Sequence, residues 1–521
     1  METETSHSHE RTAQQRSTRS IDSIHTARSL KEAGCMSRVT PILSIEEPLL
    51  FEKSRPGRKG YSFAKLDVPL ALPSRVWTDV ESRLEIEDFP EISENEVVRH
   101  FTRLSQKNCA IDLGLYPLGS CTMKYNPKIN EEIAQRKKFT QIHPFWSEAF
   151  LNPALRVQLE LQKLLSAITG LEAFTLQPSA GAHGEFTGMK IIQAYHRKKG
   201  NHHKTKILIP ESAHGTNPAT CTMLGYEIVS IPTNPSGVVE IQDIQALLSD
   251  DIAGIMMTNP NTCGLFEIHI KEIADLLHEK DALFYMDGAN FNAILGITRP
   301  ADLGVDVMHI NLHKTFSTPH GGGGPGAGAV GVRSFLKEFL PTPRIEEDKN
   351  GNAFCVEKSP DSIGRVGGYF GNFSILVRAL AYMLSIGTKP DGQGTYLKEM
   401  AEAAVLNANY IRQRLREYFS TPFDRTCMHE VLLSDESLAA FGIKTNDVAK
   451  RLMDYGFHPM TVYFPLVVQG AMLIEPTESE TKENLDEFCE AMISIAKEAR
   501  ENPELVSSAP HFAFRKRVDE L

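Results

Sequence analysis

Short apolar strands alternate with helical segments between residues 171 and 333, and this alternation restricts the fold of the chain more than any other feature. Strands that alternate with helices form a largely parallel sheet with helices on both faces. Such sheets bind ligands at the carboxyl ends of their strands. The strands are predicted at 205–209, 226–231, 253–257, 282–286 and 305–310, with helices at 242–249 and 271–280.

Patterns on either side of this region extend the prediction. Upstream, 152–170 is predicted to be a helix with Asn152 as its N-cap, Pro153 in its first turn and Gly170 at its end. Downstream, a second α/β pattern predicts a smaller C-terminal domain. Its helices are expected at 395–418, 445–455 and 479–499, its strands at 428–433 and 460–463, and an apolar run lies at 471–474.

Composition excludes several functional classes. A net charge of −11 argues against broad binding of nucleic acids or anionic membranes. No run of about 18 apolar residues occurs, so no membrane span is predicted. The eight cysteines are scattered and form no C-x-x-C pair, which favours reduced thiols in the cytoplasm over a disulfide framework or a metal site.

Polar residues follow four of the predicted strands, at the edge where ligands bind. Asp, Asn and Gly often end strands in turns, so any one of these positions has an ordinary explanation. Four strand ends with side chains suited to one chemistry are harder to explain in that way. The residues are His214 and Asn217, Asn259 and Asn261, Asp287 and Asn290, and His313 and Lys314.

Lys314 is followed by four consecutive glycines, Gly321 to Gly324. Glycine loses more backbone freedom on folding than any other residue, so such a run is costly to order. The stretch 309–328 has two interpretations: a surface lysine before a flexible linker, or an amine that forms a Schiff base beside a ligand. We expect the loop 319–326 to change shape when a cofactor binds. The alternative is that its glycines only let the backbone pass close to the ligand.

A second candidate site lies in LQPSAGAHGE, residues 176–185. Ser179, Ala180 and Gly181 precede a helix predicted to start near His183. Backbone amides at a helix start bind phosphate, although the same pattern also suits a tight turn.

Together these residues fit pyridoxal 5'-phosphate (PLP) on a parallel sheet. Lys314 supplies the amine, Asp287 keeps the ring nitrogen protonated, 179–181 holds the phosphate and His183 stacks on the ring. His313 and His214 are expected to line the reaction pocket as catalytic residues. Further candidate cofactor contacts are Asn259, Asn290 and Thr315, and no metal ligands are predicted.

Eight motifs carry a resemblance to a known family. They are YPLGSCTMKYNP, LQPSAGAHGE, SAHGTNPAT, TNPNTCGLFE, DGANFNA, LHKTFSTPHGGGGPG, SIGRVGGYFGN and GFHPMTVYFP. With them the chain resembles the glycine dehydrogenase (decarboxylating) family, the P proteins of the glycine cleavage system, and most closely the separate subunit 2 type. The resemblance covers nearly everything from Leu49 to the C-terminus.

The resemblance implies an α/β fold-type I PLP-dependent transferase, similar to the aspartate aminotransferases. It implies that glycine displaces Lys314, loses its carboxylate as CO2 and leaves an aminomethyl group on the lipoyl arm of the H protein. It also implies a partner, glycine dehydrogenase subunit 1, in an α2β2 heterotetramer.

Two other functions stay open: an aminotransferase or cysteine desulfurase of the same fold, and a non-catalytic scaffold subunit. The expected domain organisation is independent of that choice. It consists of a disordered tail (1–46), an N-terminal arm with an active-site loop segment (47–140), a PLP-binding large domain (141–390), a small domain (391–506) and a C-terminal tail (507–521).

Overall fold

A computed structural model describes residues 41–69, 86–122, 124–318, 325–394 and 396–518. Residues 1–40 of the predicted tail and 319–324 of the predicted mobile loop lie outside the described residues. The chain divides into two compact units. The first contains the described residues up to Leu113 together with Asp454–Gly456 and those from Ser508 onward, and the second contains 114–453 and 457–507.

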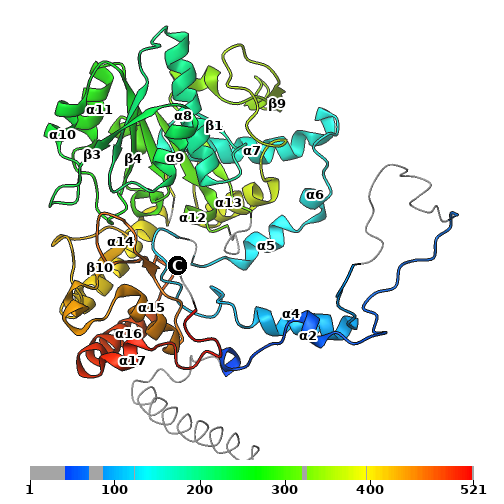
Figure 1. Ribbon diagram of the computed structural model, residues 1–521. Helices are drawn as coiled ribbons and strands as arrows, with labels where there is room; N and C mark the ends of the chain where they lie inside the picture. The colour runs from blue at the N-terminus through cyan, green and yellow to red at the C-terminus, as the bar shows by residue number, and fades with distance from the viewer. Residues whose placement is uncertain (1–40, 70–85, 123, 319–324, 395, 519–521) are drawn as a thin grey trace, which may run out of the picture. The chain divides into compact units, whose positions relative to one another are not determined.

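The second unit is built on a seven-stranded sheet of order β1-β7-β6-β5-β4-β2-β3 (Figure 1). Its five predicted strands are confirmed, each with bounds within two residues, and they run parallel. Two antiparallel strands, β1 and β7, were not predicted. The strands are β1 (Ala173–Thr175), β2 (Lys206–Pro210), β3 (Glu227–Ile231), β4 (Ile252–Thr258), β5 (Leu283–Gly288), β6 (Val307–Asn311) and β7 (Gly328–Val332).

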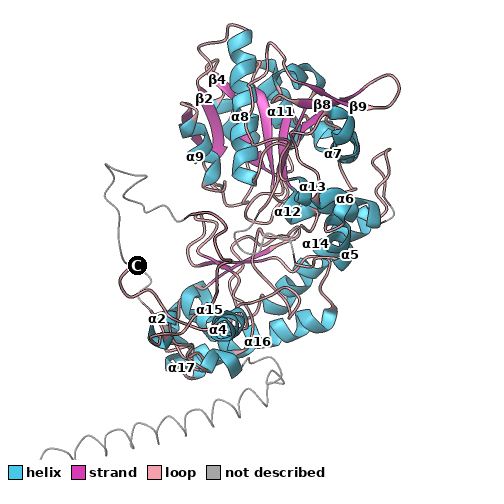
Figure 2. Cartoon of the chain, turned by 90° about the vertical axis from the view of Figure 1, so that its right-hand side faces the viewer, coloured by secondary structure: helices cyan, strands magenta, loops and turns pink. Residues whose placement is uncertain are grey.

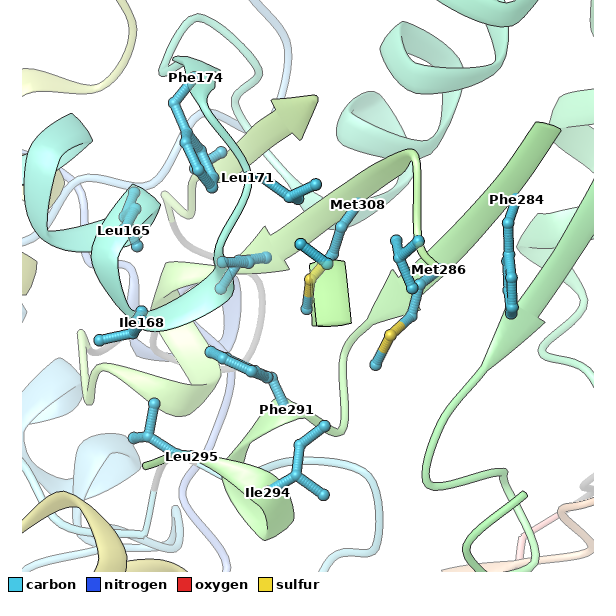
Figure 3. Close-up of a cluster of buried hydrophobic side chains, with 14 of the residues drawn as sticks. Leu165, Ile168, Leu171, Phe174, Phe284, Met286, Phe291, Ile294, Leu295 and Met308 are labelled. Atoms are coloured by element: carbon cyan, nitrogen blue, oxygen red, sulfur yellow. The ribbon is translucent and has the colours of Figure 1, made fainter. Parts of the chain in front are cut away.

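Alternating side chains of each strand point to opposite faces of the sheet, and each face packs on its own helices (Figure 2). On β5, Phe284 and Met286 belong to the core that packs against α7, α10, α11 and α13. Figure 3 shows part of this core, including Leu165, Ile168, Phe284 and Met286. Leu283 and Tyr285 join the core under α8 and α9. The bounds are α7 (Glu148–Thr169), α8 (Gly181–Lys198), α9 (Thr216–Met223), α10 (Ile241–Leu247), α11 (Ile270–Glu279) and α13 (Phe373–Ser385).

Helix α7 starts four residues before the predicted N-cap. Ser147 takes the N-cap position with extended backbone, φ −61° and ψ 150°, and Glu148 follows in the first turn. Asn152 does not cap the helix, because its side-chain amide donates instead to the carbonyl of Ala353 at 2.8 Å. The predicted end is confirmed, since Gly170 is left-handed with φ 75°.

The smaller α/β region has a three-stranded antiparallel sheet of order β10-β12-β11. Strand β10 starts three residues later than predicted, so His429 and Glu430 precede it. Strands β8 and β9 form an antiparallel hairpin. The bounds are β8 (Arg344–Glu347), β9 (Ala353–Val356), α14 (Leu397–Leu415), β10 (Val431–Ser434), α15 (Thr445–Asp454), β11 (Thr461–Val462), β12 (Ala471–Ile474), α16 (Lys482–Glu501) and α17 (Pro503–Ser507).

The first unit contains η2 (Pro41–Ser44), α2 (Leu50–Lys53) and α4 (Glu94–Ser105). Its charged centre is Glu47, whose carboxylate accepts from Arg103 Nε at 2.6 Å and lies 2.8 Å from His100 Nδ1. Across the described residues of both units, no helix has the length and apolar character needed to cross a membrane. Short helices complete the second unit: α5 (Lys128–Ala134), α6 (Lys137–Thr140), η3 (Phe291–Ile294), η4 (Pro300–Leu303), α12 (Leu312–Thr315), η5 (Ser334–Phe339) and η6 (Glu436–Phe441).

Candidate active site

Lys314 lies in the single turn of α12, directly after the carboxyl end of β6. The turn is fixed on both sides, because Leu312 N donates to Ala327 O at 3.1 Å and Ser317 N donates to Lys314 O at 3.1 Å. Lys314 is half-buried and Thr315 is buried. The predicted amine therefore stands at the edge of the sheet where ligands bind.

Asp287 is buried near the end of β5 and has several partners. Its carboxylate accepts from Asn217 Nδ2 at 3.0 Å and from Ala289 N at 2.9 Å, and it lies 3.5 Å from His309 Nε2. Burial works to raise the pKa of this carboxyl, but the nearby His309 and the hydrogen bonds outweigh burial and hold the pKa below its ordinary value. Asp287 therefore stays ionised, as a partner for a protonated ring nitrogen must.

Glu185, on the first turns of α8, is a buried site residue that the sequence interpretation missed. It accepts from Thr216 Oγ1 at 2.8 Å and from Asn217 Nδ2 at 3.0 Å. Burial, and then the Asp287 charge, raise the pKa of Glu185 to about 7. Asn217 thus joins two carboxyl groups whose pKa values are shifted in opposite directions. The available signal was the position of Glu185, two residues after His183 in the same motif.

His309 continues the network away from Asp287. Its Nδ1 lies 2.6 Å from the hydroxyl of Tyr285, and both side chains are buried. Burial lowers the pKa of His309 and raises the pKa of Tyr285 well above its ordinary value. The His309 imidazole lies between the Tyr285 hydroxyl and the Asp287 carboxylate and so fixes the orientation of that carboxylate.

The start of α8 forms the predicted anion cradle, although the helix starts at Gly181 rather than near His183. Ala180 takes the N-cap position, and no side chain caps the first amides there. A Cβ on Gly181 would lie 2.3 Å from Asn311 Oδ1, so any other residue at this point would require the Asn311 side chain to move. His183 Nδ1 accepts from Ser179 N at 3.2 Å, which holds the ring beside the cradle. The first amides of α8 are thus available to an anion.

The two candidate catalytic histidines have different surroundings. His313 is half-buried, with Nδ1 3.2 Å from Ala327 O, and a Cβ on Gly326 would lie 2.7 Å from that nitrogen. His214 lies with Nδ1 2.8 Å from Thr216 Oγ1. Burial lowers the pKa of His214, the Asp287 charge opposes this and the Lys314 charge adds to it. Both histidines thus lie beside the elements that hold Asp287 and Lys314.

Several buried polar atoms at this edge have no hydrogen-bond partner among the described residues. Unpartnered buried polar groups are costly, so a polar ligand at this place would stabilise them. Asn259 Oδ1 accepts from Glu267 N at 3.0 Å and Asn290 Nδ2 donates to Pro260 O at 3.1 Å, but their other polar atoms are unpartnered. The unpartnered atoms are Asn217 Oδ1, Asn259 Nδ2, Asn290 Oδ1, Asn311 Oδ1 and Thr315 Oγ1.

Asn261, which the sequence also suggested, is not among the residues with unpartnered polar atoms. Asn261 donates to Gly237 O at 2.8 Å and to Glu267 at 2.7 Å, and its Oδ1 accepts from Cys263 N and Leu265 N. All its polar groups are used within the loop that follows β4. Asn261 therefore shapes the loop and does not offer a contact to a ligand.

Residues 187–345 match the family model "Aminotransferase class-V", and residues 400–510 match "Glycine dehydrogenase, C-terminal domain". Fold and site together define the class, that of the fold-type I PLP-dependent α/β enzymes. Proteins described as "Probable glycine dehydrogenase (decarboxylating) subunit 2" are 51% identical over 478 residues in Caldanaerobacter subterraneus subsp. tengcongensis and 52% identical over 479 residues in Chloroherpeton thalassium. Each alignment covers 91% of this chain and 96% of the relative. The chain belongs to the glycine dehydrogenase (decarboxylating) subunit 2 family.

Solved structures agree on the fold. A glycine decarboxylase (P-protein) of the glycine cleavage system, in inhibitor-bound form, superimposes with a TM-score of 0.65 at 18% identity, covering 81% of this chain and 93% of that one. A NifS-like protein superimposes with a TM-score of 0.55 at 16% identity, covering 74% and 99%. At these identities the likeness concerns the fold alone.

Proposed function

We propose that this chain is a PLP-dependent enzyme that decarboxylates glycine and transfers the remaining aminomethyl group to the lipoyl arm of H protein. The observation that carries the proposal is the pairing of Lys314, on its one-turn helix, with a buried, ionised Asp287 at the next strand end. The names of the relatives supply the substrate.

The residues present fit the cofactor. Lys314 would bind its carbonyl carbon and Asp287 its ring nitrogen. The segment Ser179–Gly181 would hold its phosphate, with Ala180 and Gly181 offering their amides, because the Ser179 amide donates to His183 Nδ1. His183 would stack on the ring, and the unpartnered atoms of Asn259, Asn290 and Thr315 would meet its polar groups. When bound, PLP supplies a sink for the electron pair released as the carboxylate leaves.

The chain's own groups then divide the work. Asp287 stays ionised and keeps the ring nitrogen protonated, which His309 and Asn217 support by holding its carboxylate in place. His214 is predominantly neutral at pH 7, because burial lowers its pKa. Its Nδ1 accepts from Thr216 N at 3.2 Å, so its Nε2 carries a proton that it can donate. His313, adjacent to Lys314, is the second proton carrier in this proposal.

The proposal extends to organisation and partners. Residues 141–390 form the cofactor-binding domain and 391–506 the small domain, with 47–140 as an arm and 1–46 and 507–521 as tails. The chain acts with glycine dehydrogenase subunit 1 in a cytoplasmic α2β2 heterotetramer and receives the lipoylated H protein there. The phrase "subunit 2" in the names of the relatives supports a partner subunit.

Glycine-dependent exchange of labelled bicarbonate into the carboxyl group of glycine, with H protein and subunit 1 present, tests the reaction. Borohydride treatment should abolish a visible absorption band and add the mass of the reduced cofactor at Lys314. Transamination of other amino acids without bicarbonate exchange would instead support an aminotransferase. The absence of any visible band after incubation with PLP would leave only a scaffold role.

A further inference from the structure

Three fully buried side chains, those of His429, Glu430 and Glu475, meet at one end of the small sheet. His429 and Glu430 directly precede β10, and Glu475 directly follows β12. The two strands pair antiparallel with Val431 opposite Ile474, so Glu430 and Glu475 occupy the next positions outward. Ligand-type atoms of the three side chains lie within 4.8 Å of one another, and His429 Nε2 is 3.9 Å from Glu475 Oε1. We call these three residues the small-domain triad.

The two carboxyl groups of the triad need a positive charge between them. Like charges that face each other across paired strands are destabilising, and burial increases the cost. Neither oxygen of Glu475 and neither ring nitrogen of His429 has a hydrogen-bond partner among the described residues. Lys124, a buried lysine in the segment that pairs with β12, directs its Nζ instead to Leu118 O at 2.6 Å and to Cys121 O. Two side chains of the triad therefore keep all their ligand atoms unused.

The third side chain, Glu430, is held in place by two donors. Ser120 N donates to its Oε2 at 2.8 Å, and Asn290 Nδ2 lies 3.3 Å from its Oε1. A carboxylate offers about four lone-pair positions, so these two bonds orient Glu430 and leave positions for a further ligand bond. Carboxylates that bind metal ions are commonly oriented by hydrogen bonds of this kind.

A comparison within the chain shows what is unusual about the triad. Glu185, Asp287 and His309 also bring ligand-type atoms within 4.8 Å of one another. Their polar groups are satisfied, because Asn217 donates to both carboxylates and His309 Nδ1 lies 2.6 Å from the Tyr285 hydroxyl. The small-domain triad has the same spacing without these bonds, so a bound cation would supply the missing partners.

The spacing of the triad suits one metal ion. Zn²⁺ binds imidazole nitrogen and carboxylate oxygen at about 2.0–2.2 Å, so two of its ligands lie about 3.4 Å apart in a tetrahedral site. The 3.9 Å between His429 Nε2 and Glu475 Oε1 reaches this value with a small side-chain rotation.

We propose that the small-domain triad binds a divalent metal ion of the zinc class, with one ligand atom from each side chain and water in the fourth position. An imidazole beside two carboxylates suits such an ion better than Mg²⁺, which takes oxygen ligands and retains several waters. No metal ligand was predicted from the sequence, because only the pairing of β10 with β12 brings these residues together.

The bound ion has a structural role that does not depend on the proposed reaction. It neutralises the two facing carboxylates. Through Glu430 it also joins the small sheet to Ser120 and to Asn290, which follows β5. Removal of the ion should therefore lower the stability of the second unit.

Equilibrium dialysis of the untagged, cofactor-free full-length chain against zinc chloride, followed by metal analysis, tests the proposal. We expect one zinc ion per chain. The melting temperature should rise by several degrees when zinc replaces EDTA, because the ion binds only the folded state. Magnesium at the same concentration should give no such rise, and an equal rise would overturn the assignment to the zinc class.

Glu475→Gln is the first variant, because it keeps the size of the side chain and neither oxygen has a hydrogen bond to lose. It should weaken zinc binding by more than about 100-fold, since loss of an outer partner of a metal ligand alone costs about 10–100-fold. His429→Leu keeps the test decisive if Glu475→Gln does not fold, because it replaces an imidazole without hydrogen bonds by an apolar side chain of similar volume. Asn290→Ala removes an outer donor and should weaken zinc binding by about 10–100-fold.

Two control variants show where the zinc binds. Glu185→Gln alters the other cluster, and His202→Ala/His203→Ala removes two adjacent exposed histidines. Both should keep the zinc content and the zinc-dependent melting shift of wild type. The inference is overturned if wild type retains no zinc, if folded Glu475→Gln or His429→Leu binds zinc as wild type does, or if the zinc is lost with His202 and His203.

Discussion

The two sides of Lys314 differ in how their buried charges are satisfied. On the sheet side, Asp287, Glu185 and His309 each have hydrogen-bond partners from at least one other element. On the small-domain side, Glu475 and His429 have none among the described residues. The sheet side is thus organised before any ligand arrives, whereas on the other side Ser120 and Asn290 donate to Glu430 and leave Glu475 and His429 without a hydrogen bond among the described residues.

This difference separates the residues that act in the reaction from those that support the structure around it. A preorganised, hydrogen-bonded carboxylate stabilises charge in a reaction without reorganising. A sparsely partnered buried pair instead makes protonation and stability sensitive to any change in its surroundings. Substitutions on the sheet side should therefore affect turnover most, and those on the small-domain side should affect pH dependence and stability.

The largest effect is expected at Lys314, which both sides share. Lys314→Ala removes the amine that holds the cofactor, so glycine–bicarbonate exchange should fall by at least about 10³-fold. The visible band should be absent, and borohydride should add no mass. Lys204→Met serves as the control, because Lys204 is also buried but its Nζ donates to the carbonyls of Ile252 and Lys280. Exchange near the wild-type rate in Lys314→Ala would contradict the proposed role.

The next largest effect should come from the sheet side. Asp287→Asn should retain bound cofactor but lose exchange by about 10²-fold or more, because the ring nitrogen no longer stays protonated. Asp306→Asn is a matched control: Asp306 is also buried and accepts from Phe284 N at 2.8 Å, but at the amino ends of the strands. Exchange should remain within a few-fold of wild type in the control. Comparable losses in both variants would mean that Asp287 acts only through stability.

The sheet side was also easier to predict from the sequence, because its residues belong to local sequence patterns. Strand periodicity placed Asp287 and Lys314 at strand ends, and small residues before a helix placed Gly181 at the cradle. Glu185 was missed although it lies in the same motif, because its role depends on Asn217, 32 residues away. Strands β1 and β7 were missed because their antiparallel pairing joins segments far apart in sequence.

The small-domain side could not be predicted from any local pattern. Ser120 contacts Glu430 across 310 residues, and Thr461 contacts Gly119 across 342. The segment that contains Ser120 was predicted only as part of the arm and active-site loop segment at 47–140. It is largely buried because its backbone pairs with β12, a contact that depends on tertiary structure alone.

The pH dependence of the free energy of unfolding should report on the buried carboxyl group of Glu430 on the small-domain side. Burial and the Glu475 charge raise the pKa of Glu430 to about 8, from the usual 4.5. A raised carboxyl pKa stabilises the fold below the unfolded-state value, and this contribution is lost as pH rises from 4.5 to 8. Glu430→Gln has no such loss, so its stability relative to wild type should increase by on the order of 3 kcal/mol between pH 5 and pH 8.

Thermal melts of the cofactor-free protein in EDTA at pH 5, 6.5 and 8 measure this difference. Glu185→Gln is the sheet-side counterpart. Because the pKa of Glu185 is about 7, the increase in the stability of this variant relative to wild type should be smaller than for Glu430→Gln and should be complete by pH 8. A parallel pH dependence in wild type and Glu430→Gln would show that the carboxyl group does not titrate in this range.

The smallest effect is expected at His183. Its ring would stack on the cofactor while Nδ1 accepts the Ser179 amide, so His183→Ala removes one stacking contact and one hydrogen bond. Each is worth about 1 kcal/mol, and the sum predicts roughly a tenfold to thirtyfold weaker affinity for PLP, measured by the visible absorbance during PLP titration. His183→Phe separates the two terms, because it keeps a flat ring but cannot accept the amide hydrogen bond. If stacking dominates, Phe should recover most of the affinity while Ala does not; if the two variants bind equally poorly, the ring organises the cradle and does not contact the cofactor.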